Sequence, residues 1–243
     1  MKKIFLYILA GSLCFAACKK DDEVETFVEP EDINVRNSYD EQAIQKFMDN
    51  NYLDSQGNIK AFSSTDASDD NEKKLSQLSP QTLPSGVIYI KRDGAQPNPG
   101  VTLNTDSSST DATLIKTMMR ANYYLATDAD GNVALTYYGS LLNTLDGSGS
   151  PYTDPTFYYA KKSLLSDTKP RSYYEIPGFK EGLKYFQGYN NLPNSELPNL
   201  QGVIIVPSKA AFARNDNYYG LKNITFVFNF QIYNAQTRPA DQQ

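Results

Sequence analysis

Apolar and polar residues alternate most regularly near the C-terminal end of the chain. Within the range 223–234, Phe226, Phe228, Phe230 and Ile232 occupy every second position, and smaller or polar residues stand between them. A period of two is typical of a β-strand with one buried face. The sequence therefore predicts a strand over 223–234 whose aromatic face lines a core or a pocket.

Four earlier segments have the same β-type character, namely 87–91, 114–127, 133–142 and 201–207. Asp130 and Gly131 lie between the second and the third, and an Asp-Gly pair between two strands indicates a tight hairpin turn. The stretch 128–132 also offers oxygen ligands for calcium. Gly139 stands, however, where the twelve-residue loop of an EF-hand needs a glutamate, so a hairpin turn is the favoured interpretation.

A helical pattern precedes these strands. Ser38 and Glu41 have the spacing of a capping box, which predicts that a helix begins at Ser38. Ile44, Phe47 and Met48 then fall on one face of that helix. We expect an amphipathic helix that packs against its own domain rather than against a partner protein.

The first residues of the chain have the pattern of a bacterial lipoprotein signal. Lys2 and Lys3 precede an apolar run over 4–15, which is too short for a membrane-spanning helix and is typical of a signal peptide. The small residues that follow, directly before Cys18, resemble a lipobox. This pattern predicts that Cys18 is lipidated, and an ordinary signal peptide with a chance cysteine is the alternative.

The residues after Cys18 predict where the protein is held. The run Lys-Lys-Asp-Asp-Glu over 19–23 resembles the surface-export signal of certain Gram-negative lipoproteins, although charge runs of this kind are usually solvated tethers. Several acyl chains give a firm membrane anchor. We therefore expect the protein on the outer membrane, with the cell surface favoured over the periplasmic face.

Composition excludes several kinds of chemistry. The chain has no His and only two Cys, so it cannot build a Ser-His-Asp triad or a His-ligated zinc site. A sequence pI of about 4.9 argues against a groove that binds nucleic acid. No metal and no cofactor is expected. Because 18 Tyr and 12 Phe are present and Trp is absent, any binding pocket is expected to be walled by phenyl and phenol rings.

Three stretches resemble the FKBP-type peptidyl-prolyl isomerases, and they occur in the family's order. Residues 133–141 read VALTYYGSL, similar to the family's Tyr-x-Gly-x-Leu. Residues 176–183 read IPGFKEGL, similar to Ile-x-Gly-Trp-x-Glu-Gly-Leu, which is the most specific of the three. Residues 205–212 read IVPSKAAF, similar to Ile-Pro-Ser-x-x-Ala-Tyr-Gly. The resemblance covers about residues 85–234.

The resemblance implies an α+β fold, in which a curved antiparallel sheet wraps over one short helix and carries an N-terminal helical extension. The predicted organisation is a signal peptide (1–17), an acidic tether (18–37), an N-terminal helix and loop extension (38–86), an FKBP-like domain (87–234) and a C-terminal tail (235–243).

The resemblance also implies a pocket that grips proline without covalent catalysis. It places Tyr137 at the wall, Phe179 at the floor and Phe228 on the last strand. Ile176 would offer its N–H to a peptide carbonyl, and Phe212 stands where the family has a Tyr that donates a hydrogen bond to the bound peptide. We expect these side chains to converge, and we expect proline-containing polypeptide segments as partners.

The sequence departs from the family in ways that affect activity. The family's Phe-Asp pair has no clean counterpart, and Tyr152 and Asp154 are the nearest substitutes. Phe179 is smaller than the usual Trp, and Phe212 has no hydroxyl. The leading hypothesis is a lipid-anchored isomerase or chaperone for exported proteins. The alternative is a non-catalytic accessory subunit beside an outer-membrane translocon for secretion or gliding motility. A glycan-binding lipoprotein ranks below both.

Overall fold

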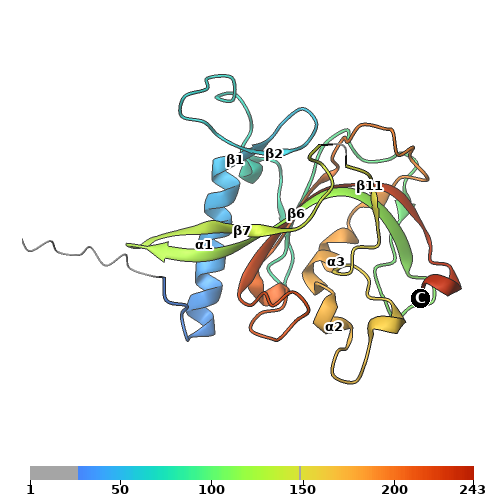
Figure 1. The fold of residues 1–243 in the computed structure, drawn as a ribbon. Coiled ribbons are helices and arrows are strands. Elements are labelled where there is room, and N and C mark those ends of the chain that lie inside the picture. Colours follow the sequence, from blue (N-terminus) through green and yellow to red (C-terminus); the bar gives the residue numbers. More distant parts are fainter. Residues whose placement is uncertain (1–26, 148) are drawn as a thin grey trace, which may run out of the picture.

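A computed structural model describes residues 27–147 and 149–243 (Figure 1). The predicted signal peptide (1–17) and residues 18–26 of the predicted tether, Cys18 included, lie outside the described residues. Within the described ranges, no helix is both long enough and apolar enough to cross a membrane.

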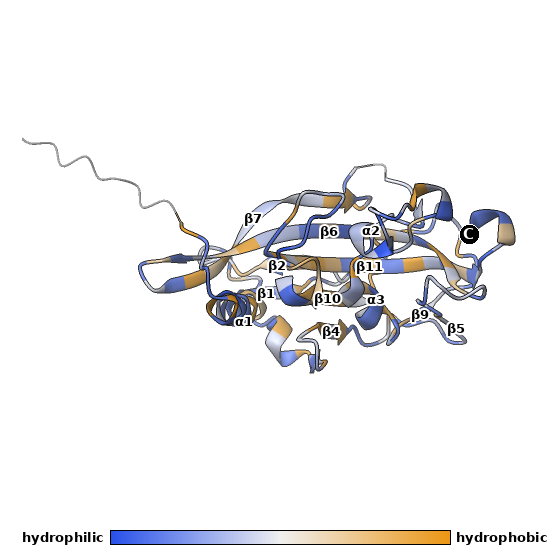
Figure 2. Ribbon diagram, turned by 90° about the horizontal axis from the view of Figure 1, so that it is seen from below, coloured by the Kyte–Doolittle hydropathy of each residue, from blue (hydrophilic) through white to orange (hydrophobic). Residues whose placement is uncertain are grey.

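The chain has an α+β fold dominated by one seven-stranded antiparallel sheet. Across the sheet the strands run β3 (Gln81–Thr82), β4 (Ile88–Lys91), β10 (Gly202–Val206), β11 (Ile224–Thr237), β6 (Thr113–Ala129) and β7 (Asn132–Asn143), and β8 (Tyr152–Thr153) also pairs with β6. Figure 2 shows the longer strands of this order side by side. Two small sheets pair β1 (Asn51–Leu53) with β2 (Ile59–Ala61), and β5 (Val101–Thr102) with β9 (Gln187–Gly188).

Helices lie on both faces of the sheet. The helix α1 (Ile33–Asn50) crosses one face, whereas α2 (Arg171–Tyr174) and α3 (Pro177–Leu183) lie beneath the long strands β6 and β11 on the other (Figure 1). Short 3-10 turns complete the fold, namely η1 (Leu75–Gln77), η2 (Lys162–Leu164), η3 (Ser208–Ala210) and η4 (Ala240–Gln242).

The hairpin that joins β6 to β7 confirms the predicted turn. Ala129 pairs with Asn132, so the turn consists of Asp130 and Gly131 alone. Both residues have positive φ, at 55° and 78°. A two-residue turn that matches the twist of its strands needs positive φ at both positions, which explains the Asp-Gly pair.

The strand β11 is buried on both faces, whereas its alternating pattern predicted one buried face. Phe226, Phe228 and Phe230 belong to the core that includes α3. Val227, on the other face, belongs to a second core that includes Ile44 of α1. The polar residues between the phenylalanines are therefore interior. Asn229 is one of them, and its side-chain amide donates to the carbonyls of Gly57 and Gly202 at 2.9 and 3.1 Å.

The N-cap of α1 lies six residues earlier than the sequence predicted. Asp32 is the N-cap, and its carboxylate accepts a hydrogen bond from the backbone N–H of Asn34 at 2.8 Å. Aspartate at this position satisfies an N–H that has no partner within the helix. Ser38, which was predicted to be the N-cap, lies inside the helix instead. The predicted tether therefore ends before Ile33.

A buried ion pair joins α1 to the sheet. Arg36 and Asp40 are 0 % and 1 % exposed and bond to each other. Arg36 Nη1 also donates to the carbonyl of Ala126 in β6 at 2.7 Å, and Asp40 Oδ2 accepts from the N–H of Ser208 at 2.8 Å. Because a buried charge is tolerated only when it is paired and hydrogen-bonded, these contacts fix where the helix lies.

Candidate functional site

The structure brings three of the predicted pocket rings into one aromatic cluster. Phe179 of α3 and Phe228 of β11 have ring centroids 4.2 Å apart. Phe212, which follows η3, meets Phe226 at 6.1 Å, and Phe226 lies 6.1 Å from Phe228. Convergence of side chains from separate motifs is what the resemblance predicted. However, Phe179, Phe212 and Phe228 are at most 3 % exposed, so they form a packed core rather than an open pocket.

The two glycines of α3 allow this helix to lie close against β10. A Cβ atom on Gly178 would lie 2.5 Å from a methyl group of Val206, and one on Gly182 would lie 2.8 Å from a methyl group of Ile204. The two glycines are four residues apart and share one face of the helix. The spacing of the IPGFKEGL motif therefore allows the helix to approach the strand closely, and this approach seats Phe179 on the sheet.

The backbone amide of Ile176 is already bonded within the chain. Its N–H donates to the carbonyl of Phe157 at 2.8 Å. The ring of Phe157 also packs against the predicted pocket, with centroids 5.6 Å from Phe179 and 5.5 Å from Phe228. The carbonyl of Phe157 thus takes the hydrogen bond that the resemblance assigns to a bound peptide. Sequence reasoning missed this residue, because no local pattern links it to Ile176.

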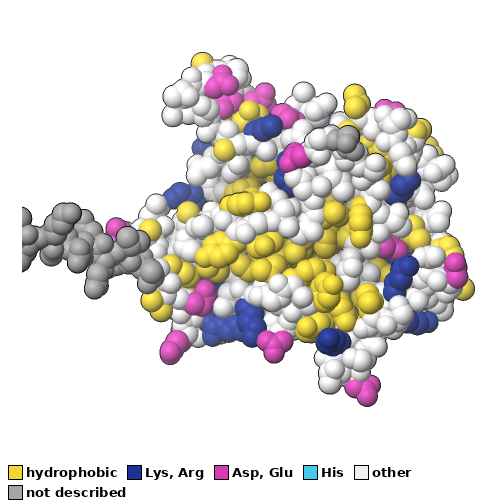
Figure 3. Space-filling model, viewed as in Figure 1, with side chains coloured by type: hydrophobic (Ala, Val, Ile, Leu, Met, Phe, Trp, Pro, Cys, Tyr) yellow, Lys and Arg dark blue, Asp and Glu magenta, His cyan; other side chains and the backbone are white. Residues whose placement is uncertain are grey.

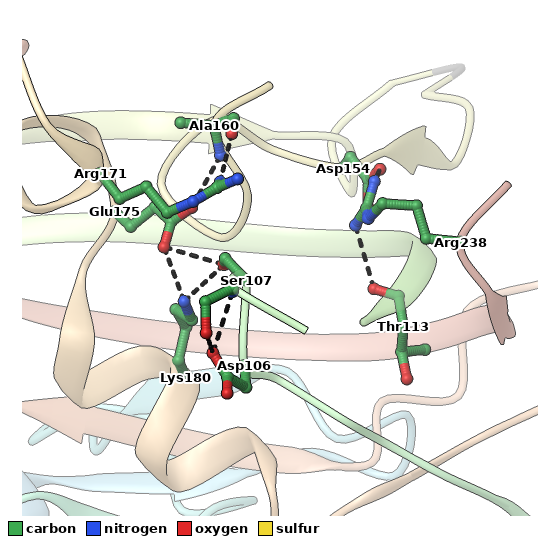
Figure 4. Close-up of polar contacts among 10 residues, drawn as sticks. Asp106, Ser107, Thr113, Asp154, Ala160, Arg171, Glu175, Lys180 and Arg238 are labelled. Atoms are coloured by element: carbon green, nitrogen blue, oxygen red, sulfur yellow. Dashed lines mark hydrogen bonds and ion pairs between the residues drawn. The ribbon is translucent and has the colours of Figure 1, made fainter. Parts of the chain in front are cut away.

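The segment that carries Phe157 is fixed by polar contacts at both ends. At one end, Asp154 forms a buried ion pair with Arg238 (Figure 4). Asp154 Oδ1 also accepts from the N–H of Ile115 at 3.2 Å. Both oxygens of Asp154 are therefore bonded within the chain. These contacts are typical of a structural ion pair, whereas the sequence analysis predicted the acidic residue of a pocket. Arg238, which the sequence analysis placed in a C-terminal tail, is buried directly after β11.

At the other end of the segment, Glu175 is the centre of a second ion cluster. Its carboxylate accepts hydrogen bonds from Arg171 Nη1 at 3.1 Å, Lys180 Nζ at 2.6 Å and Ser107 Oγ at 2.9 Å (Figure 4). It also accepts from the N–H of Ala160 at 2.9 Å. The cluster lines a cavity of about 480 Å³. Its charges satisfy one another, which is typical of a structural cluster.

Metal binding finds no support among the residues that the structure describes. Over 27–147 and 149–243, no group of three or more His, Cys, Asp or Glu side chains is arranged to hold an ion. A second cavity, of about 840 Å³, lies between β4 and the residues around η1, and none of the predicted site residues lines it.

Tyr137 does not join the other predicted pocket residues. It is 59 % exposed, and its ring meets Tyr124 at 5.7 Å. Tyr124 in turn packs against Phe47 of α1 at 5.6 Å, so Tyr137 lies on the α1 face of the sheet. Side chains alternate between the faces of a strand, and Tyr137 falls on the face opposite α3. Its assignment to the pocket wall is therefore wrong.

Aromatic side chains continue the buried cluster to the molecular surface. We call Tyr152, Tyr174, Tyr218 and Tyr219 the tyrosine surface, although Tyr174 itself is only 5 % exposed. Tyr152 is included because, after burial and Tyr218, it also raises the pKa of Tyr219. Tyr219 packs on Phe212 at 5.8 Å, Tyr218 on Tyr219 at 5.1 Å, and Tyr174 on Tyr218 at 5.3 Å. Tyr218 and Tyr152 are 58 % and 49 % exposed. Figure 3 shows hydrophobic side chains gathered in a band across the face of the molecule that is seen in Figure 1.

The loop between η3 and β11 positions Tyr218 and Tyr219. Asn217 Oδ1 accepts from the N–H groups of Tyr219 and Leu221 at 3.1 and 3.2 Å. The N–H of Tyr218 donates to the carbonyl of Tyr173 at 2.8 Å, which ties the loop to α2. An Asn side chain that bonds nearby backbone groups is a common turn device. The Asn-Tyr-Tyr-Gly sequence was the available signal for these residues, and the sequence analysis did not use it.

Comparison with known proteins gives little further guidance. No family model matches the chain, and no curated protein matches it. Among solved structures, FkpA from Escherichia coli is similar over 66 % of this chain, with 18 % identity and a TM-score of 0.36. The chain spans about half of FkpA, 53 % of its length. A similarity this distant does not establish a function, so the motif residues must be judged by their own contacts.

Proposed function

We propose that this protein is an FKBP-like module that binds polypeptide segments as a chaperone or accessory subunit, without efficient isomerase activity. The observation that carries the proposal is the tyrosine surface. The exposed ring of Tyr218 continues outward through Tyr219 from Phe212, which belongs to a core to which three motif residues contribute, and Tyr152 is exposed as well. Proline-rich segments dock on aromatic-lined surfaces because their extended conformation is already formed. The surface therefore suits proline-containing, unfolded or extended segments.

Weak isomerase activity follows from the contacts of Ile176. A prolyl isomerase of this type needs a free amide to hold the peptide carbonyl while the bond twists, and selective stabilisation of the twisted state is what lowers the barrier. Here the carbonyl of Phe157 takes that hydrogen bond. A substrate would have to displace Phe157, whose ring is 3 % exposed.

Efficient isomerisation is the second candidate function. It is favoured by the packing of Phe179 and Phe228 at 4.2 Å, beside Ile176 in one cluster, as the resemblance implies. A proline-isomerisation assay on a short X–Pro peptide separates the two candidates. The soluble fragment that starts at Asp21 should show turnover near the uncatalysed rate. Turnover comparable to an active isomerase would overturn the non-catalytic proposal.

Binding is tested separately with a permanently unfolded protein, reduced and carboxymethylated α-lactalbumin. Tyr218→Ala and Tyr152→Ala should each weaken binding several-fold, because they remove exposed rings of the tyrosine surface. Tyr137→Ala is the matched control, since Tyr137 is equally exposed but lies on the other face of the sheet. Equal loss of binding in all three variants would point to a non-specific effect and would count against the proposed site.

We further propose that Cys18 is lipidated and holds the protein on the outer membrane, on the cell surface rather than the periplasmic face. The motivation is the small-small-Cys pattern after the apolar run and the charged stretch over 19–23. Residence beside an outer-membrane translocon would bring the tyrosine surface to exported chains. Mass spectrometry of the mature N-terminus should find acyl groups on Cys18, and an N-terminus at another residue would refute the anchor.

A further inference from the structure

A small cavity lies between α1 and the sheet, on the face opposite α3. Its volume is about 150 Å³, whereas sites for drug-sized ligands usually measure about 300–1,000 Å³. Phe47 of α1, Ile59 of β2 and Val227 of β11 give it apolar walls. The cavity therefore has room for a small apolar group, such as one side chain, but not for a large ligand.

Three hydrogen-bond donors of β6 also line this cavity. Arg120, Asn122 and Tyr124 stand at every second position of the strand, so their side chains share one face of the sheet. All three are partly exposed, so a molecule from solvent can reach them. Within the described residues, the amide of Asn122 donates only to the Tyr124 hydroxyl, at 3.5 Å, which is longer than an ordinary hydrogen bond.

The hydroxyl of Tyr124 remains a donor at neutral pH. Burial is the largest effect on this group, and it raises the pKa of Tyr124 above its ordinary value. In the part of the chain that the structure describes, this hydroxyl donates to no acceptor. The cavity thus offers a guanidinium, an amide and a hydroxyl to an acceptor that enters it.

The charge of the cavity favours an anion. Among the described residues that line it, Arg120 is the only charged one. Arg120 Nη2 donates to Asp146 Oδ1 at 2.5 Å, but Asp146 is not part of the lining and its side chain is 66 % exposed. Exposed ion pairs contribute only about 0–1 kcal/mol, so another carboxylate can replace Asp146 at little cost.

We propose that this cavity binds the carboxylate of a small apolar acid or of a polypeptide C-terminus, with Arg120, Asn122 and Tyr124 as donors. A guanidinium pairs with a carboxylate through two parallel hydrogen bonds, and the amide and hydroxyl can satisfy its remaining lone pairs. The apolar walls receive the short side chain beside the carboxylate. A single cation matches the one negative charge of a carboxylate better than the roughly two charges of a phosphate group.

This site is independent of the proposed function, because it lies on the face of the sheet opposite the core that underlies the tyrosine surface. NMR titration of the wild-type chain with N-acetyl-leucine tests it, and N-acetyl-leucinamide is the matched ligand that lacks the charge. The acid should bind at least tenfold more tightly than the amide. Inorganic phosphate should bind more weakly than the acid.

Two variants should shift the dissociation constant of the acid in opposite directions. Arg120→Gln should raise it at least tenfold, or by about 1.4 kcal/mol. Asp146→Asn should lower it several-fold, because it removes the competing carboxylate. Lys222→Gln is the matched control and should change nothing, since Lys222 also pairs with an exposed carboxylate, that of Asp216, but does not line the cavity. Both pairs are exposed, so all three variants should melt close to wild type.

The peptide Ala-Ala-Ala-Ala-Leu with a free C-terminus separates the two sources of the carboxylate. Tighter binding of this peptide than of N-acetyl-leucine assigns the site to polypeptide ends, and weaker or equal binding assigns it to small acids. Four results would overturn the inference. These are equal binding of acid and amide, no binding of either carboxylate at millimolar concentration, tighter binding of phosphate, and weaker binding by Asp146→Asn. The last result holds even if Arg120→Gln does not fold.

Discussion

Replacing Asp154 with alanine would decide whether this carboxylate belongs to a binding pocket or to the framework of the protein. In the structure, Asp154 pairs with Arg238, and the two side chains are 6 % and 0 % exposed. Arg238 also donates to the carbonyl of Thr113 at 3.1 Å, and its guanidinium lies 3.3 Å from the ring centroid of Tyr159. Asp154→Ala leaves that guanidinium buried without its counter-ion.

The expected loss is large for a single substitution. Breaking a buried ion pair by removing one partner lowers the free energy of unfolding by about 3–5 kcal/mol. For a domain of this size, each kcal/mol shifts the melting temperature by about 2–4 °C, so the melting temperature should fall by roughly 6–20 °C. Contacts that Arg238 keeps with Thr113 and Tyr159 place the result toward the lower end of that range.

Urea unfolding followed by circular dichroism measures the loss, and the chain offers a matched control. Asp146 pairs with Arg120 at 2.5 Å, but its side chain is 66 % exposed. Exposed ion pairs contribute about 0–1 kcal/mol, so Asp146→Ala should change the free energy of unfolding little. The double variant Asp154→Ala, Arg238→Met should recover part of the loss, because no buried charge remains unpaired.

Two results would refute this reasoning. The first is that the Asp154→Ala variant is as stable as the Asp146→Ala variant, which would mean that the buried pair contributes nothing to the free energy of unfolding. Alternatively, the variant could keep its stability and lose binding of unfolded protein or turnover of an X–Pro peptide. That pattern would return Asp154 to the pocket in which the sequence analysis placed it.

Three further predictions follow from buried groups. Phe179→Trp, which would restore the usual residue of the FKBP motif, should lower the free energy of unfolding by about 1–3 kcal/mol, because the ring is fully buried 4.2 Å from Phe228; unchanged stability in urea would show that the site has room for a larger ring. Arg36→Met should lower the free energy of unfolding by about 3–5 kcal/mol by leaving Asp40 unpaired, and hydrogen exchange should show faster opening of α1; protection equal to wild type would contradict this. Burial, with a smaller effect from Asp154, raises the pKa of Tyr158, so above pH ~10 the unfolded chain releases this proton while the folded chain retains it. Stability should therefore fall as pH rises past 10, and Tyr158→Phe should reduce the slope by up to about 1.4 kcal/mol per pH unit; identical slopes in the two proteins would refute the assignment.

Local patterns predicted the strands well. The Asp-Gly turn set the register of the hairpin between β6 and β7, because only a few turn types fit two residues between strands. The same patterns could not show that Asn229 and the other polar residues of β11 face a second core. A polar residue in an alternating strand indicates solvent unless another element covers it, and here α1 and the β1–β2 hairpin cover this face.

The sequence predicted the positions of candidate site residues only where a local motif determines how they pack. The resemblance placed Phe179 through its motif, and Gly178 and Gly182 of the same motif allow α3 to lie close against β10. The bond between Ile176 and Phe157, and the pair of Asp154 with Arg238, depend on where distant segments meet. Tyr137 was misplaced because a motif match does not reveal which face of a twisted, bulged strand a side chain occupies.

The position of α1 has a consequence for how the chain folds. Its apolar face packs on Val203, Ile205 and Val227, and Asp40 bonds to the backbone of Ser208, so the first helix needs β10 and β11, the last two strands of the described chain. Isolated helices are marginal in water and gain most of their stability from packing. A chain whose contacts are so distant in sequence folds slowly, because loops must close before those contacts form. While it is being made, the N-terminal part therefore has no core to join, and the protein folds only when its C-terminal strands have emerged.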